Sequence, residues 1–554
     1  MTSVAAQTGA SPFARVRPVG VEAVRLEDRF WAPRRQRNRD ITLPSQHRRC
    51  EETGRLDNFR RASGSVPGPF QGRYYNDSDV YKWMEACAFT LADGPHAPTE
   101  ALLDGVIQDV AAAQGPDGYL NTYFTFDRVP ERWSNLRDLH ELYCAGHLMQ
   151  AAVAHHRSTG RTDLLAVARR LADCICGVFC SADAGGRDGA CGHPEIETAL
   201  IELYRETGER RYLDQARRFL ESRGHHLLGG SPYHQDHVPF RELEAVTGHA
   251  VRMLYLACGA ADLSAETGDA GYRETLFRLW DNLVTRRVYL TGGVGARYDG
   301  ESFGADYELP NRRAYAETCA AIGVVMWAHR MLLLTGDGRF ADQMETTLYN
   351  AVLAGASLDG ERYFYQCPLE DDGTHRRQPW FACACCPPNV ARLLASLPGY
   401  FASVGGDGLW LHLYATGQTT AVLPGGAAVA VRQETDYPWQ GDILLRVEPE
   451  VPAEFVLHLR VPGWCERPTL RINDSVWDAM VVEQGYLAIR RLWNPGDTVS
   501  LTLPMPVERI GCRVPWRRIA GAARCSAGRS CIVWRPPTAG GGTRGNWASP
   551  ETPS

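Results

Sequence analysis

The stretch AAIGVVMWAHRMLLL, residues 320–334, is apolar at almost every position. A helix that is apolar all round has to be buried on every side. A second stretch of the same character, GHAVRMLYLACGAADL, occupies residues 248–263. The two stretches predict inner helices that are surrounded by other helices.

A Thr-Gly pair recurs around these helices. The segments RSTGRTDLL, RETGERRYL, AETGDAGYR and LLTGDGRFA each end one helical pattern and begin another, and their glycines are Gly160, Gly208, Gly268 and Gly336. A glycine just past a helix end can adopt the left-handed conformation that caps the helix, and a polar residue after it can start the next helix. These segments therefore predict helix hairpins.

The hairpins recur from about residue 80 to about residue 400. This repetition predicts a ring or solenoid of helix pairs rather than a simple bundle. If the pairs close into a barrel, every inner helix is buried, in agreement with the apolar stretches. We expect polar groups in loops at the mouth of the ring to form the functional site.

The pattern changes from about residue 407 to short alternating runs such as LWLHLYAT and EFVLHLRVPGW. Alternation with a period of two, interrupted by turn residues, is typical of a β-sandwich. After about residue 511 the alternation stops and Arg, Gly, Pro and Ser dominate, which predicts a disordered or aberrant tail and suggests a coding-frame change. The predicted parts are an N-terminal arm (1–20), a helical domain (21–405), an accessory β-sandwich (406–510) and the tail (511–554).

Composition narrows the class of protein. The chain has 554 residues, 44% hydrophobic and 22% charged, as soluble globular proteins do. The net charge is −6 without a basic stripe, so nucleic acid is not an expected partner. No apolar run is long enough for a signal peptide or a membrane span, which predicts a cytoplasmic protein with no membrane partner. Seventeen cysteines in such a compartment predict buried thiols rather than a disulfide framework.

Three cysteines lie close together in CACCPPN, residues 383–389. Glu317 and Cys319 lie upstream, just before the apolar stretch at 320–334. Together with Cys385 and Cys386 they offer one oxygen and three sulfur ligands, a tetrahedral set suited to zinc. The sequence leaves two alternatives open, namely a buried loop with structural cysteines and a redox pair, although a disulfide between neighbouring cysteines is strained.

The two prolines of this motif carry an expectation of their own. Pro387 and Pro388 follow the thiols directly. Proline is disfavoured inside a helix and restricts the residue before it. We therefore expect the pair to prevent a helix here and to present the thiols from an extended backbone.

A glycine-rich loop and three histidines are further candidates. TGGVGARYDGE, which ends at Glu301, could deliver a carboxylate as a general acid, or could be a solvated acidic loop. His140, His193 and His249 each lie near the start of a helix in a different hairpin, so a ring would bring them together. Each alone is more often structural. Tyr365 could line the same pocket, although core packing is the commoner use of an aromatic ring.

Five motifs together resemble glycoside hydrolase family 127, the β-L-arabinofuranosidases. They are DRFWAPRRQRNRDITLPSQHRRCEETGRLDNF, GHPEIETAL, GESFGADYELPN, YAETCAAIG and FACACCPPNVAR, and the likeness runs from about residue 20 to about 510. It implies a mainly α chain, with an (α/α)6 barrel catalytic domain followed by a β-sandwich. It also implies a retaining exo-hydrolase that releases L-arabinose from non-reducing terminal β-L-arabinofuranosides.

The resemblance also assigns roles to residues. It implies a zinc ion held by Glu317, Cys319, Cys385 and Cys386, with Cys385 as the nucleophile and Glu301 as the general acid/base. The positions that would contact the sugar are His140, His193, His249 and Tyr365. The implied partners are a small or oligosaccharide glycoside and a second copy in a homodimer. Members of this family usually continue past the point where the alternation stops here, so we expect sandwich strands to be missing. The unpaired strand edges of an incomplete sandwich predict poor solubility or an altered oligomeric state, which would affect the dimer.

Two other functions fit parts of the pattern. A sugar epimerase or isomerase on a helical toroid would use the three histidines as acid and base, but would leave the cysteines without a role. A non-catalytic carbohydrate-binding protein would use a zinc ion only for structure. A zinc requirement separates the epimerase from the hydrolase. For the binding protein, Cys385→Ser would lower stability and no glycoside would be hydrolysed.

Overall fold

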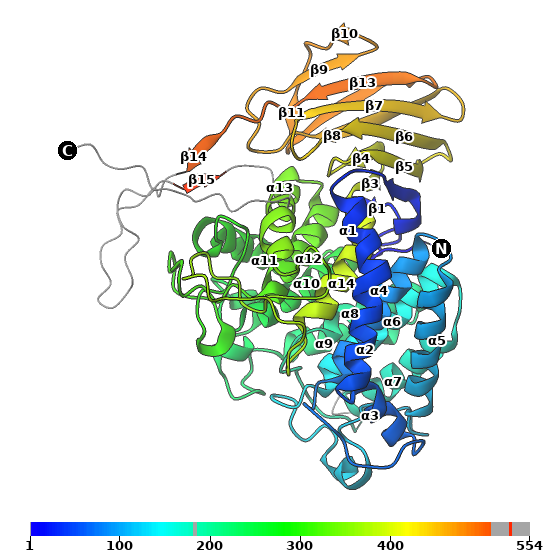
Figure 1. Cartoon of the computed structure of the whole chain (residues 1–554), viewed down its shortest axis with the longest axis vertical. Helices are drawn as coiled ribbons and strands as arrows, with labels where there is room; N and C mark the ends of the chain where they lie inside the picture. Colours follow the sequence, from blue (N-terminus) through cyan, green and yellow to red (C-terminus); the bar gives the residue numbers. More distant parts are fainter. Residues whose placement is uncertain (1, 181–184, 511–530, 534–554) are drawn as a thin grey trace, which may run out of the picture.

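The computed structural model describes residues 2–180, 185–510 and 531–533. Helices dominate its first four hundred residues (Figure 1). The α-helices are α1 (Trp31–Arg37), α2 (Leu43–Glu52), α3 (Arg55–Ala62), α4 (Asp77–Ala92), α5 (Ala97–Ala112), α6 (Glu141–Thr159), α7 (Asp163–Val178), α8 (Ile196–Thr207), α9 (Arg210–Ser222), α10 (Ala250–Thr267), α11 (Ala270–Asn282), α12 (Thr318–Thr335), α13 (Gly338–Thr347) and α14 (Cys386–Ser396).

Six of these helices close into an inner ring. Each packs on the next in the order α4, α6, α8, α10, α12 and α14, and α14 packs back on α4. The outer helices α5, α7, α9, α11 and α13 each pack on the inner helix that precedes them, while α1 and α2 cover α14. The arrangement is the expected (α/α)6 barrel.

The Thr-Gly pairs end the inner helices as predicted. Gly160, Gly208, Gly268 and Gly336 are the C-caps of α6, α8, α10 and α12, with φ between 69° and 75°. The apolar stretch 320–334 lies in α12. This helix is long and apolar enough by composition to cross a membrane, but 89% of its apolar window is buried inside the structure.

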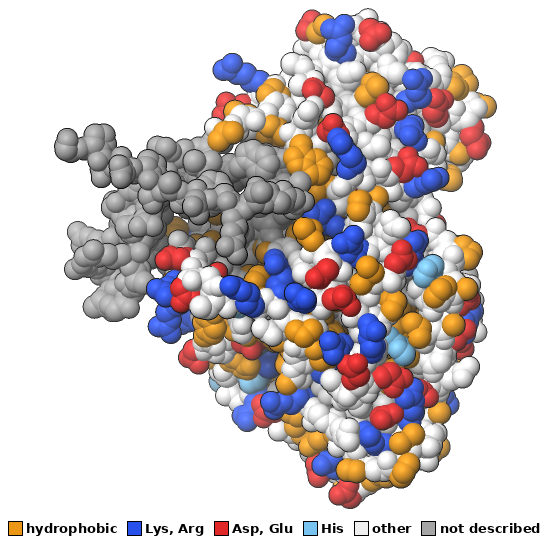
Figure 2. All heavy atoms as spheres, viewed as in Figure 1, with side chains coloured by type: hydrophobic (Ala, Val, Ile, Leu, Met, Phe, Trp, Pro, Cys, Tyr) orange, Lys and Arg blue, Asp and Glu red, His pale blue; other side chains and the backbone are white. Residues whose placement is uncertain are grey.

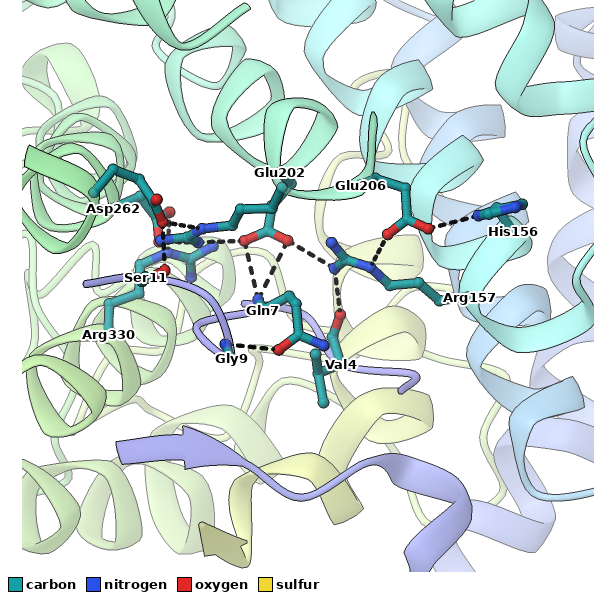
Figure 3. A network of polar contacts seen from close by, with 12 residues as sticks. Val4, Gln7, Gly9, Ser11, His156, Arg157, Glu202, Glu206, Asp262 and Arg330 are labelled. Carbon is teal, nitrogen blue, oxygen red and sulfur yellow. Dashed lines mark hydrogen bonds and ion pairs between the residues drawn. The ribbon is translucent and has the colours of Figure 1, made fainter. Parts of the chain in front are cut away.

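The N-terminal segment covers the C-terminal ends of the inner helices (Figure 3). The backbone N–H of Gln7 donates to the carboxylate of Glu202 at 3.2 Å, and the guanidinium of Arg157 donates to the carbonyl oxygen of Val4 at 3.1 Å. Further along, the N–H of Arg15 donates to the carbonyl of Leu333. The segment therefore closes one end of the barrel.

A buried network of ion pairs lies beneath this segment. Arg157 pairs with Glu202 at 2.7 Å, Arg205 pairs with Asp262 at 2.8 Å, and Arg330 pairs with the same aspartate at 2.6 Å. These side chains belong to α6, α8, α10 and α12. The network thus ties four inner helices together at one end and leaves the other end for a site.

Two sheets form the β-rich part that follows the barrel (Figure 1). One has the order β1-β3-β4-β8-β12-β11 and the other the order β10-β9-β13-β7-β6-β5-β2; β4 and β8 run parallel and the other neighbours antiparallel. The strands are β1 (Val16–Pro18), β2 (Val24–Leu26), β3 (Ala402–Gly405), β4 (Gly408–Leu411), β5 (Gly417–Val422), β6 (Ala428–Thr435), β7 (Asp442–Pro449), β8 (Ala453–Arg460), β9 (Thr469–Ile472), β10 (Ser475–Val476), β11 (Val482–Glu483), β12 (Tyr486–Trp493) and β13 (Asp497–Thr502).

The sandwich crosses two of the predicted domain boundaries. Strand β1 comes from the predicted arm and β2 from the start of the predicted helical domain, and β3 begins at Ala402. On the barrel side, the buried Arg460 of β8 pairs with Asp342 and Glu345 of α13. The N-terminal strands and this ion-pair cluster join the barrel to the sandwich. The domain boundaries otherwise remain predictions.

The predicted tail lies mostly outside the described residues. Within it, β15 (Cys531–Val533) pairs antiparallel with β14 (Glu508–Ile510). On the face in Figure 2, positive and negative side chains are interspersed over the barrel and the sandwich. The described part of that face has no extended patch of a single sign.

Candidate active site

The predicted site residues gather at the N-terminal ends of the inner helices. His140, His249, Glu317 and Cys385 are the N-caps of α6, α10, α12 and α14, and His193 lies shortly before α8. The N-terminus of a helix carries a partial positive charge and unpaired N–H groups, so it stabilises anions. Five helices thus direct favourable dipoles at one place, opposite the end that the N-terminal segment closes.

The four predicted metal ligands lie together. The ligand atoms of Glu317, Cys319, Cys385 and Cys386 all lie within 4.8 Å of one another. The Sγ atoms of Cys319 and Cys386 are 3.3 Å apart, and the Sγ atom of Cys385 lies 3.5 Å from Oε1 of Glu317. Ala316, directly before the helix, has a φ of 42°, which turns the chain so that two residues near one helix start converge.

The expectation for the two prolines is wrong. Helix α14 begins at Cys386, and Pro387 and Pro388 lie in its first turn. Proline is well tolerated there, because the first N–H groups of a helix have no partner within it and the ring fixes φ at a helical value. Cys385 also has helical backbone angles, with φ −63° and ψ −35°. The prolines therefore start the helix that presents the thiols.

The chemistry of this group fits a metal ion. Oε2 of Glu317 is buried, and no described residue offers it a hydrogen bond. Burial and the negative charge of Cys385 raise the pKa of Glu317 well above its ordinary value. Burial also raises the pKa of Cys319, but the hydrogen bonds with Cys385 and Cys386 outweigh burial and lower that pKa to about 6. Such crowding of acidic groups is what a bound cation relieves.

Glu301 lies beside this group and contacts His249. Nε2 of His249 is 3.1 Å from Oε2 of Glu301, and both ligand atoms lie within 4.8 Å of a carboxylate oxygen of Glu317. Burial raises the pKa of Glu301, but the hydrogen bond with His249 and smaller contributions outweigh burial, so the pKa is lowered. Glu301 has a φ of 49°, a strained value for this residue that fixes the direction of its side chain.

The three histidines form a row across the cavity. The ring centroids of His140 and His193 are 5.6 Å apart, and those of His193 and His249 are 5.7 Å apart. Burial lowers the pKa of all three, that of His140 to about 3, so the rings are neutral at pH 7. Neutral imidazoles can donate and accept hydrogen bonds, which suits recognition of sugar hydroxyl groups.

Tyr365 completes the predicted set. Its hydroxyl lies 3.1 Å from Sγ of Cys385 and 3.6 Å from Sγ of Cys383. All the predicted residues except Cys386 line one cavity of about 220 Å³. The structure therefore brings every predicted site residue to one place.

Several residues of the cavity wall were not predicted from the sequence. They are Tyr74, Tyr75, Tyr143, Tyr233, Arg252 and Tyr255. Five of them are tyrosines, for which core packing is the commoner use. Tyr143 and Tyr255 lie within α6 and α10, whereas Tyr74 and Tyr75 precede α4. The guanidinium of Arg252 lies 4.5 Å from the centre of the Tyr233 ring and beside the histidines. Lys82, buried behind this wall, was also missed, although the sequence carries a signal for it.

Comparisons with known proteins agree with this site. A sequence profile described as β-L-arabinofuranosidase, GH127 catalytic domain, matches residues 23–399, and the GH127 middle-domain profile matches residues 408–505. A non-reducing end β-L-arabinofuranosidase of Bifidobacterium longum subsp. longum is 37% identical over 529 residues, which are 86% of this chain and 77% of the relative.

Solved structures give the same result. The GH127 β-L-arabinofuranosidase of Geobacillus stearothermophilus T6 superposes with a TM-score of 0.85 at 43% identity, over 88% of this chain and 82% of that one. Another GH127 β-arabinofuranosidase superposes with a TM-score of 0.85 at 38% identity, over 90% of this chain and 82% of that one. A helical barrel with acidic and thiol groups at its mouth is here the framework of a glycoside hydrolase. The chain belongs to the GH127 β-L-arabinofuranosidase family.

Proposed function

We propose that the enzyme releases L-arabinose from the non-reducing ends of β-L-arabinofuranosides with retention of configuration. One observation carries the proposal: the thiol of Cys385 and the carboxylate of Glu301 line the same small cavity, and Glu317 contacts both. A cavity of about 220 Å³ suits a single sugar unit at a chain end. The name of the B. longum relative supports this substrate class.

Zinc is the metal that we propose for the Glu317 group. Three sulfur atoms and one carboxylate oxygen form a soft, four-membered ligand set of the kind that favours zinc. A bound zinc ion would keep the cysteines as thiolates at neutral pH. Cys319 and Cys386 are fully buried, whereas Cys385 is partly exposed to the cavity. Cys385 is therefore the thiolate that a substrate can reach.

In the first step, Sγ of Cys385 attacks the anomeric carbon. The new C–S bond forms while the bond to the leaving oxygen breaks, and Glu301 gives that oxygen its proton. The histidine row and Tyr365 hold the sugar hydroxyl groups during this step. The products are a sugar bound covalently to Cys385 and the free aglycone.

In the second step, the carboxylate of Glu301 takes a proton from water. The water oxygen attacks the anomeric carbon from the side that the aglycone left, and the C–S bond breaks to restore the thiolate of Cys385. Glu301 then carries the proton that the next cycle needs. Two displacements restore the original configuration at the anomeric carbon.

A histidine-based epimerase accounts for less of the cavity. It would use the row of neutral imidazoles but would leave the four-residue ligand group, three members of which line the same cavity, without a role. A binding protein with a structural metal ion would not need the partly exposed thiol beside Glu301.

Hydrolysis of p-nitrophenyl β-L-arabinofuranoside tests the proposal. We expect turnover by the wild type, and a loss of at least about 10²-fold in Glu301→Ala and in Cys385→Ser, since each removes a reacting group. The zinc content of each sample separates chemistry from metal loss, and Glu301→Ala should retain about one zinc ion per chain. Full activity in Cys385→Ser would refute the thiolate mechanism, and a zinc-loaded wild type without turnover would refute the substrate.

A further inference from the structure

Lys82 is the only lysine in the chain. The sequence contains 59 Lys and Arg residues, and every one of the others is arginine. Arginine therefore serves wherever a positive charge is needed on the surface, in ion pairs and in the core. A single exception indicates a position where the shape or chemistry of an ammonium group is required, because Lys and Arg are not interchangeable at defined sites.

The position of Lys82 is unusual for a cation. It lies on the inner helix α4 with 0% of its surface exposed, and its Nζ donates a hydrogen bond to the hydroxyl of Tyr143 at 2.7 Å. Among the described residues, no carboxylate forms an ion pair with it. Buried arginines nearby are paired: Arg55 contacts Asp79 and Arg392 contacts Glu85. A buried charge is costly unless something compensates it.

The negative groups that compensate the charge of Lys82 lie on the side of the cavity. Tyr143 lines the cavity together with Cys319, Cys385 and Glu317. Burial lowers the pKa of Lys82, but the charges of Tyr255, Cys385 and Cys319 outweigh it and raise the pKa, so the ammonium is protonated. The acidic group at the mouth of the barrel is therefore the anionic counterpart of this cation.

The charges of the proposed zinc site do not cancel, which leaves a role for Lys82. A carboxylate and three thiolates carry four negative charges, and a divalent ion neutralises two of them. The remaining negative charge is buried, and a positive charge nearby stabilises it more strongly there than in water. We propose that Lys82 is a positioning residue of the hydrolase: its ammonium offsets the excess charge of the Glu317 group and holds Tyr143 against the cavity. The inference rests on the proposed function.

The charge of Lys82 also bears on catalysis. When the C–S bond breaks in the second step, negative charge returns to Sγ of Cys385. A fixed positive charge that is already in place stabilises this developing charge without reorganisation. Removal of Lys82 should therefore weaken zinc binding and lower kcat more than it raises KM.

Lys82→Met in the zinc-loaded enzyme tests the proposal. We expect the zinc dissociation constant, measured by competition with a chelator, to rise about tenfold to hundredfold, as for other groups that support metal ligands. The thermal midpoint should fall by no more than the weaker zinc binding accounts for, because Lys82 has no carboxylate ion-pair partner of its own. If this variant does not fold, Lys82→Gln removes the charge but keeps a donor for Tyr143, with the same expectation.

Arg330→Met is the matched control. Arg330 is also buried on an inner helix, but it pairs with Asp262 at the closed end of the barrel. We expect this variant to lower the thermal midpoint and to leave the zinc dissociation constant unchanged. A change mainly in zinc affinity for the Lys82 variant, and mainly in thermal midpoint for the Arg330 variant, would distinguish a role at the site from a role in folding.

Equal zinc affinity and equal kcat/KM in Lys82→Met and the wild type would overturn the inference and leave the hydrolase proposal intact. If the wild type binds zinc but does not cleave arabinofuranosides, the substrate assignment fails while the zinc comparison still decides on Lys82. A wild type that binds no zinc refutes both.

Discussion

The contact with His249 is the largest of those that lower the pKa of the proposed acid/base. His249 lies 3.1 Å from Glu301, and its hydrogen bond lowers the pKa of that carboxyl against the effect of burial. The first step needs protonated Glu301, so kcat/KM should fall as the pH rises through this pKa. Because the pKa of Glu301 is lowered, the fall in kcat/KM on the alkaline side of its maximum should begin at low pH.

His249→Ala should move that limb. Without the imidazole the pKa of Glu301 rises, so the fall in kcat/KM shifts to higher pH, while kcat/KM at its maximum drops about tenfold to hundredfold through lost positioning. The measurement is a pH profile of kcat/KM on an arabinofuranoside. His193→Ala is the control, because in the described part of the chain His193 forms no hydrogen bond or ion pair with Glu301. An unshifted limb in His249→Ala would show that His249 does not control the acid.

Most of the individual site residues could be predicted from the sequence. Cysteines and an acidic residue near helix starts are typical of metal ligands, and this pattern predicted the group of Glu317, Cys319, Cys385 and Cys386. The ring of helices explains how these residues come together. The tyrosines of the wall could not be separated from core residues by pattern alone. Lys82 could have been noticed, since a residue type that occurs once among so many arginines needs a local reason.

At the scale of elements, the hairpin glycines offer a direct test. Gly208 caps α8 with φ 74°, and a Cβ atom built there meets nothing within 4 Å. Gly208→Ala should therefore report backbone strain alone, about 1 kcal/mol of lost stability. Gly105, inside α5, is equally open but has ordinary helical angles, so Gly105→Ala should gain up to about 1 kcal/mol. Thermal midpoints that move in opposite directions would support the assignment; a neutral Gly208→Ala would argue against strain at the cap.

The helices were more predictable than the strands that join them to the sandwich. An apolar pattern repeated over a long helix is a strong signal, and the Thr-Gly pairs mark its ends. Strands β1 and β2 have three residues each, too short for alternation to be recognised, and they pair with β3 and β5 from a distant part of the chain. The prolines of α14 were misinterpreted because proline starts a helix as readily as it ends one.

At the scale of the molecule, the two ends of the barrel have separate tasks. The N-terminal ends of the inner helices hold the reactive groups, crowded thiols and carboxylates whose mutual repulsion costs stability. The C-terminal ends hold the buried ion pairs and the N-terminal segment (Figure 3). Strain at the open mouth is tolerable because the closed end fixes the helices independently.

Glu202→Gln tests this separation. Glu202 is 2% exposed and pairs with Arg157 and Arg205, so its neutralisation leaves two buried guanidinium groups less compensated. We expect a loss of about 3–5 kcal/mol in stability, the usual cost of breaking a buried pair. Asp214→Asn breaks the exposed pair with Arg210 and should cost less than about 1 kcal/mol. In Glu202→Gln that is still folded at 25 °C, zinc affinity and KM should equal those of the wild type, because the substitution lies at the closed end of the barrel. A changed zinc affinity without a lower thermal midpoint would show instead that the two ends are coupled.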